Sequence, residues 1–284
     1  MAELVSVTDG TARFTLQFFA DRNWAPAPGS PATRERSCDF RGPHGRWGHE
    51  PIETAQSWIG LLVIAATDHL GSLATLSGPG SAAVFGGTGI ARLAVEAAAR
   101  ASWLLEPSLD VFGRVQRGYA LRLAGLRHAV GVLTKMRAPE TAIAEREQQV
   151  EKVLRRADRL GIPVHRRDGA PTGLVLGPPT NESLVAELFG SVGIQQGAGI
   201  YAFLSSVVHS HPWALLQFAD TTSPREDGLI GLQPRLTLAD LEHSVMVAVA
   251  SHVGLCDRLF PYYGFDSELW ASWRVHALRA VLRR

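Results

Sequence analysis

The segment Tyr201–Trp213, YAFLSSVVHSHPW, combines an apolar helical pattern with side chains that could do chemistry. Ser205 precedes His209 by four residues, a spacing that allows a hydrogen bond between them on one side of a helix. His209 is a candidate acid or base, with Ser205 and Tyr201 as candidate catalytic partners. No orienting acid and no oxyanion site, which a serine nucleophile needs, can be seen nearby. The alternative is a histidine that only satisfies the end of its helix.

A second group of charged residues interrupts the apolar segment Arg92–Leu105. Arg92, Glu96 and Arg100 recur every four residues, so a helix places them on one face. One glutamate between two arginines leaves one positive charge in excess, and this charge would bind a carboxylate or phosphate if the face is buried. The alternative is a structural ladder of ion pairs that fixes this helix to a neighbour.

We therefore expect an interior pocket that binds a small organic anion or a nucleotide-like molecule. In this hypothesis Arg92 or Arg100 holds the anion, and His209 donates or accepts a proton. The candidate lining residues are Asp68, Arg92, Glu96, Arg100, Tyr201, Ser205 and His209. The sequence leaves open whether the protein is an enzyme, and it leaves the identity of any cofactor unknown.

Several histidines have spacings that would place two metal ligands on one helix face. The residues concerned are His209, His211, Asp240, His243, His252 and Cys256. A site of this kind would suit a metal-dependent oxygenase or cyclase. The chain lacks HExxH, CxxC and the Glu-x-x-His pair of di-metal helical bundles, so we assign no metal ligand.

Motifs of three large enzyme classes are also missing. There is no GxxxxGK[ST] phosphate loop and no GxSxG nucleophile elbow. The run Gly87–Arg92 begins like the dinucleotide-binding GxGxxG, but Arg92 occupies the position of the third glycine. We interpret this run as a turn.

Arg122 and His128 fit the Arg-x(4–6)-His pattern of helical HEPN ribonucleases, as do Arg159 and His165. The chain is rich in arginine and has ten histidines, so several such pairs arise by chance. Leu123 also stands where that family has a polar residue. A HEPN-like ribonuclease or toxin is therefore a further alternative function.

The segments RLAVEAAARASWLLEP, YAFLSSVVHSHPWAL and ATDHLGSLATL together resemble an uncharacterised all-helical protein family of actinobacteria. That family is itself distantly similar to HEPN-like bundles, some of which are toxins or antiviral ribonucleases. The resemblance spans most of residues 53–265. It implies a helical fold and brings no activity with it.

Composition and net charge argue against nucleic-acid-binding, secreted and membrane proteins. The net charge is only +1, so no overall field attracts nucleic acid or a membrane surface, and nucleic-acid binding is not favoured. Two cysteines and the lack of a signal-peptide pattern favour a reduced, cytoplasmic location. The apolar stretch Trp58–Ala66 is shorter than the roughly 20 residues that a membrane-spanning helix needs.

Residues 1–50 differ in pattern from the rest of the chain. Ala12–Ala20 alternates weakly and predicts a short strand, and a segment rich in proline and glycine follows it. We interpret residues 1–50 as an irregular N-terminal arm, with Trp24 and Trp47 as candidate anchors on the remaining domain.

Residues 51–284 have helical periodicity and predict one helical bundle domain of about seven or eight helices, hence an all-α fold. Gly161–Pro179 is expected to be a loop, Thr88 an N-cap, and Thr237 or Asp240 another. An apolar bundle of this kind is also compatible with a non-catalytic protein that forms a homodimer through its helices. The predicted helices are Glu53–Leu76, Thr88–Leu105, Leu109–Arg137, Glu140–Leu160, Asn181–Gly190, Gly199–His211, Thr237–Phe260 and Ser267–Arg283.

Overall fold

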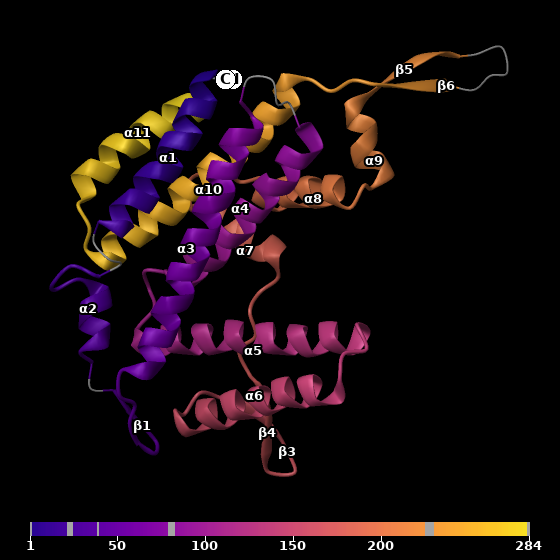
Figure 1. Ribbon diagram of the computed structural model, residues 1–284. Coiled ribbons are helices and arrows are strands. Elements are labelled where there is room, and N and C mark those ends of the chain that lie inside the picture. Colours follow the sequence, from indigo (N-terminus) through magenta and orange to yellow (C-terminus); the bar gives the residue numbers. More distant parts are fainter. Residues whose placement is uncertain (1, 22–24, 39, 79–82, 225–229, 283–284) are drawn as a thin grey trace.

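Three long helices, α3 (Glu50–Leu76), α4 (Val84–Leu104) and α10 (Leu238–Tyr263), pack together at the centre of the fold (Figure 1). The computed structural model describes residues 2–21, 25–38, 40–78, 83–224 and 230–282. Within these residues the chain is mostly helical (72%), with eleven α-helices and three two-stranded antiparallel hairpins. The prediction of a largely helical protein is confirmed, although the helices outnumber the seven or eight expected.

Helix α4 is buried on most of its surface, because small side chains let its neighbours approach closely. A Cβ atom added to Gly87 would overlap the end of the Leu241 side chain on α10, so glycine lets the two helices pack here without moving that leucine. The helix begins at Val84, and Thr88 is therefore an interior residue whose hydroxyl donates to the Val84 carbonyl at 2.9 Å. The predicted turn at Gly87–Arg92 and the N-cap at Thr88 are wrong.

The N-terminal residues form a helix, α1 (Ala2–Ala20), where a strand was predicted over Ala12–Ala20. Its buried residues follow a helical period, and threonine hydroxyls along this face donate to carbonyls four residues earlier. Three phenylalanines in its second half were mistaken for strand residues, but they pack on aromatic rings of α10 and α11 (Ser267–Leu282). Tertiary packing thus outweighs local strand propensity, and α1 belongs to the bundle.

The remainder of the expected arm is less regular. It holds a short helix, α2 (Pro31–Arg36), and the hairpin of β1 (Arg41–Gly42) and β2 (Gly45–Arg46). Trp47 is buried and donates from Nε1 to the Leu160 carbonyl at 3.1 Å, which confirms it as an anchor. Trp24 lies outside the described residues.

Helices α5 (Val111–Lys135) and α6 (Glu140–Arg159) lie side by side and form a layer below the central helices in Figure 1. The Asp110 carboxylate caps α5 by accepting from the Gly113 amide at 2.8 Å. The loop predicted after α6 is instead a hairpin of β3 (Val164–Arg167) and β4 (Ala170–Leu174). Asp168 and Gly169 adopt positive φ at its turn, and such residue pairs favour hairpins.

Helices α7 (Asn181–Ser191) and α8 (Gly197–Val208) pack against α4. The chain leaves α8 through Ser210, whose φ of 53° ends the helix, so α8 stops before the predicted His211. The next elements are α9 (Pro212–Leu215), a 3-10 turn η1 (Leu216–Phe218), β5 (Ala219–Pro224) and β6 (Ile230–Pro234).

The ends of α10 match the sequence pattern. Thr237 and Asp240 form a capping box, in which the Asp240 carboxylate accepts from the Thr237 amide at 2.8 Å. Gly264, with a φ of 68°, closes the helix in the left-handed conformation.

Among the described helices α3 is long and apolar enough to cross a membrane by length and composition. The uninterrupted apolar run Trp58–Ala66 covers only part of this helix. The core helix of a soluble protein passes the same test, and 39% of the apolar window of α3 is buried against other helices.

Candidate functional site

Glu96 lies at the centre of a cluster of polar side chains contributed by α4, α7 and α8. Its Oε1 atom accepts hydrogen bonds from Arg92 Nε at 2.9 Å and from the Tyr201 hydroxyl at 3.0 Å. Its Oε2 atom faces Arg100 Nη2 at 3.4 Å. The side chains of Arg92 and Glu96 are 17% and 11% exposed, so this ion pair is shielded from solvent. The predicted group on α4 is therefore a real cluster, and Tyr201 joins it from α8.

Asn181 is a member of this cluster that sequence reasoning missed. Its Oδ1 atom accepts from Arg100 Nη2 at 2.9 Å, and its Nδ2 atom donates to the Tyr201 hydroxyl at 3.4 Å. The sequence indicates Asn181 only as the first residue of a predicted helix. Thr180 caps that helix, which leaves the Asn181 side chain free to join two other helices.

His209 is exposed at the C-terminal end of α8 and lies beside Arg92. The distance from Arg92 Nη1 to His209 Nε2 is 3.3 Å. A guanidinium has no acceptor atom, so this hydrogen bond requires an unprotonated Nε2 that can accept. Burial alone would lower the pKa of Arg92, but Tyr201 and Glu96 together raise it, so Arg92 stays charged. The cluster thus holds an exposed imidazole next to a permanent cation.

Two other candidate residues lie apart from this cluster. Ser205 is half-buried on α8, and within the described residues its hydroxyl forms no hydrogen bond with the His209 imidazole; the two residues share only the backbone hydrogen bond of the helix end, at 3.0 Å. Asp68 is exposed on the outer side of α3 and forms no ion pair with Arg92 or Arg100. The structure therefore brings together Arg92, Glu96, Arg100, Tyr201 and His209, and leaves out Ser205 and Asp68.

An apolar groove of about 820 Å³ lies near the cluster and is lined by chain neighbours of its residues, not by the cluster residues themselves. Val208 and Ser210, which flank His209, line the groove, and so does Gly89, one turn before Arg92 on α4. Six large apolar side chains at or beside the groove are at least 40% exposed: Phe85, Val208, Trp213, Leu216, Leu232 and Leu236. Convergent polar groups at the edge of an apolar cavity are typical of small-molecule sites.

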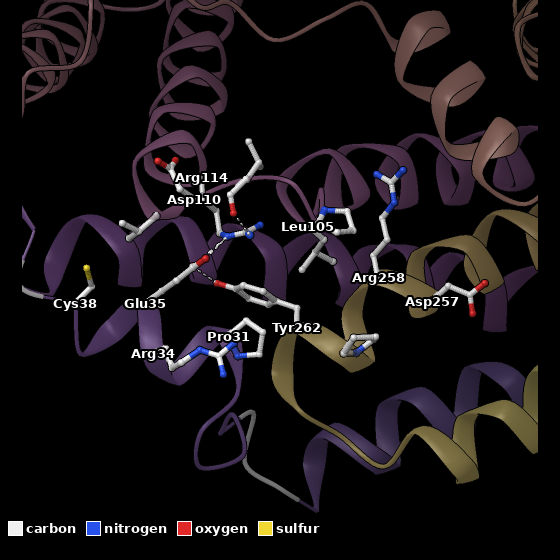
Figure 2. A pocket seen from close by; sticks show the side chains of 14 residues that line it. Pro31, Arg34, Glu35, Cys38, Leu105, Asp110, Arg114, Asp257, Arg258 and Tyr262 are labelled. Atoms are coloured by element: carbon white, nitrogen blue, oxygen red, sulfur yellow. Dashed lines mark hydrogen bonds and ion pairs between the residues drawn. The ribbon is translucent and has the colours of Figure 1, made fainter.

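A second cavity, of about 510 Å³, lies between α2, the start of α5 and α10 (Figure 2). Figure 2 shows Arg114 and Tyr262 pointing toward Glu35. The Tyr262 hydroxyl donates to Glu35 Oε2 at 2.6 Å, Arg114 Nε lies 3.0 Å from the same atom, and the Arg114 guanidinium stacks on the Tyr262 ring at 4.3 Å. Burial, with Glu35 alongside, raises the pKa of Tyr262, so its hydroxyl stays protonated.

The polar groups of this second cavity already have partners within the protein. Arg114 also donates to the carbonyl of Leu104, at the end of α4, and to that of Leu109 at 3.5 Å. At the rim, Arg258 pairs with Glu106 and Glu187, at 3.4 and 3.2 Å. We therefore assign a structural role to this network, which joins α2, α4, α5 and α10.

The histidines proposed as metal ligands do not converge. His252 is buried and contacts Thr15 Oγ1 through Nε2 at 3.0 Å, whereas His243 and His211 are exposed. Burial lowers the pKa of His252 to about 4 and raises that of the Cys256 thiol, so both groups are neutral near pH 7. Over the described part of the chain, no three His, Cys, Asp or Glu residues gather as metal ligands would. Cys38 and Cys256 are both free thiols.

The ribonuclease candidates Arg122 and His128 both lie on α5. Six residues on one continuous helix separate side chains by about 9 Å along the axis and about 240° around it. Arg122 therefore does not meet His128 within one chain.

No family model, curated protein or solved structure matches this chain.

Replacing Arg114 with alanine is expected to lower the free energy of unfolding by about 3–5 kcal/mol, because it leaves Glu35 buried without its cation. Urea unfolding measures this loss. The control is Arg13→Ala, which breaks the exposed 2.8 Å ion pair with Asp9 and should cost less than about 1 kcal/mol. Equal losses in the two variants would contradict the structural role of Arg114.

His252 should make stability depend on pH between about 4 and 6.5. Over this range the unfolded chain binds a proton at this imidazole and the folded chain does not. The free energy of unfolding therefore rises with pH through this window, by about 3 kcal/mol in total. This contribution of His252 is lost again as the pH falls toward 4. The free energy of unfolding, measured with urea at several pH values in this range, should rise less steeply with pH for His252→Leu than for the unchanged protein. If the free energy of unfolding depends on pH equally in both proteins, the fold does not lower the pKa of His252.

Proposed function

We propose that this protein binds a small organic anion with an apolar body, in the groove beside Arg92 and His209. The observation that supports this most is the position of the cluster. A half-buried arginine and an exposed histidine meet at 3.3 Å, near an apolar groove of about 820 Å³. A volume of this size suits a small organic ligand.

The charge of the cluster favours an anion. Arg92 and Arg100 share the single carboxylate of Glu96, which leaves one positive charge in excess. The groove itself offers almost no polar partner, because its lining is apolar apart from Ser210 and backbone groups. A ligand that suits both parts has a hydrocarbon or aromatic body and one carboxylate or similar acidic group.

His209 gives this site a possible catalytic group. Its Nε2 atom must be unprotonated to accept from Arg92, and an unprotonated imidazole can take a proton from a bound ligand. Arg92 would then stabilise negative charge that develops on the ligand. Tyr201 and Glu96 hold Arg92 in place and are positioning residues in this proposal.

Octanoate titrated into the protein by calorimetry tests the proposal, with octan-1-ol as its uncharged counterpart. Octanoate should bind, and octan-1-ol should bind at least about tenfold more weakly because it lacks the charge that Arg92 meets. Arg92→Met and His209→Ala should each weaken octanoate binding, by about tenfold for the arginine. Native mass spectrometry of the purified protein would reveal any ligand retained from the host.

Two matched controls separate the site from general effects. Leu216→Arg should block the groove, whereas Leu269→Arg on α11 should not, although both leucines are 47% exposed. His211→Ala should bind like the unchanged protein. If the Arg92 and His209 variants bind octanoate normally, the proposal fails. If they alter only melting temperature or oligomeric state, the cluster belongs to a non-catalytic protein that associates through its helices.

A further inference from the structure

Charge is divided unevenly along the chain, which the net value of +1 conceals. Residues 111–174 contain thirteen Lys and Arg but only six Asp and Glu, a net charge of +7. The rest of the chain therefore carries −6. This segment comprises α5, α6 and the β3–β4 hairpin, the layer below the central helices in Figure 1.

A groove of about 770 Å³ opens in this positively charged layer, separate from the site beside His209. Helix α3 contributes Glu50 and Trp58, and the remaining lining residues come from α5 and α6. The cations that line it are Arg122, Lys152, Arg156 and Arg159. Glu50 is the only carboxylate in the lining, so the groove has a net charge of +3.

Three of the four cations have no acidic partner in the described structure. Arg156 is paired with Glu50 at 3.1 Å, which uses the one carboxylate available. Arg122, Lys152 and Arg159 form no ion pair with any described residue. This distinguishes the groove from the cavity around Arg114, where guanidinium groups and carboxylates neutralise one another.

Tyr119 provides an independent sign of an incomplete site. Its side chain lines the groove and is 1% exposed, yet its hydroxyl has no hydrogen-bond partner in the described residues. Arg156 lies beside this hydroxyl without meeting hydrogen-bond geometry and acts to lower the pKa of Tyr119, but burial is the larger effect and raises it. A buried hydroxyl without a partner is rare and points to a group that the protein alone does not supply.

We propose that this groove binds a phosphorylated small molecule with a flat aromatic ring, of the nucleotide class. Arg122, Lys152 and Arg159 would bind its phosphates, because unpaired guanidinium and ammonium groups are the usual donors to phosphate oxygens. Trp58, half-buried at the α3 side, offers an aromatic surface for a ring, and the Tyr119 hydroxyl offers a hydrogen bond.

A neighbouring cavity indicates where the phosphates lie. This cavity, of about 480 Å³, is lined by Lys152, Arg155 and Arg159 and by one carboxylate, Asp158, which is paired with Arg166. Lys152 and Arg159 therefore stand between the two cavities. If the aromatic ring lies against Trp58, the phosphate chain points toward Lys152 and Arg159, and opposite charges meet. A diphosphate reaches farther toward these two residues than a monophosphate.

Calorimetry on the full chain at low salt tests this with ADP, adenosine and inorganic phosphate as probes. ADP should bind, phosphate should bind more weakly, and adenosine should not bind measurably. Arg122→Gln and Arg159→Gln should each weaken ADP binding about tenfold, since each removes a charge-assisted hydrogen bond. Trp58→Leu should weaken ADP binding without affecting inorganic phosphate.

Two further variants distinguish a site from a charged surface. Lys135→Gln, at the exposed end of α5, removes the same charge outside the groove and should leave ADP binding unchanged. Tyr119→Phe should fold with equal or greater stability, because it removes an unsatisfied hydroxyl, and should still lose affinity for ADP. The proposal is overturned if no probe binds, if Lys135→Gln weakens binding as much as Arg122→Gln, or if only an RNA oligonucleotide binds.

Discussion

A helix that is buried on most of its surface can carry charged side chains only where other groups neutralise them or bind them by hydrogen bonds. Helix α4 meets this constraint in its last three turns. Glu96 neutralises Arg92 and Arg100. Tyr201 brings α8 against the same carboxylate, and Asn181 brings α7 against Arg100 and Tyr201. The end of α4 is satisfied in a similar way, because Arg114 donates to the Leu104 carbonyl. The packing of α5, α7 and α8 around α4 therefore depends on polar contacts as well as on apolar burial.

The arginines and lysines that line the cavities of this protein differ in how many of their partners the protein itself supplies. Arg114 has a carboxylate, two carbonyls and an aromatic ring as partners, so nothing remains for a ligand. Arg122, Lys152 and Arg159 have no acidic partner in the described residues, although they line one groove. The cluster at Arg92 lies between these extremes, since it is internally bonded but keeps one positive charge in excess.

The sequence predicted the parts of the fold that depend on local periodicity and capping. The helices predicted at Glu53–Leu76, Leu109–Arg137 and Glu140–Leu160 match α3, α5 and α6 to within a few residues at each end. The cap at Thr237 and the spacing of Arg92, Glu96 and Arg100 are also confirmed, because each involves residues within one or two turns. The helix α1 was missed, because its phenylalanines suit a strand locally and its pairing with α10 and α11 spans over 200 residues. The roles of Asn181 and Arg114 depend on contacts between distant helices, and a net charge of +1 concealed the segregated positive layer.

The proposed site makes one geometric claim, that an anion with an apolar body lies between the groove and the Arg92–His209 pair. A crystal structure of the protein grown with octanoate tests this most directly. We expect the octanoate carboxylate within hydrogen-bond distance of Arg92 or His209, and its hydrocarbon chain in contact with Val208 and Leu216. Octanoate seated elsewhere, or a groove that stays empty at a concentration that calorimetry shows to be saturating, would contradict it.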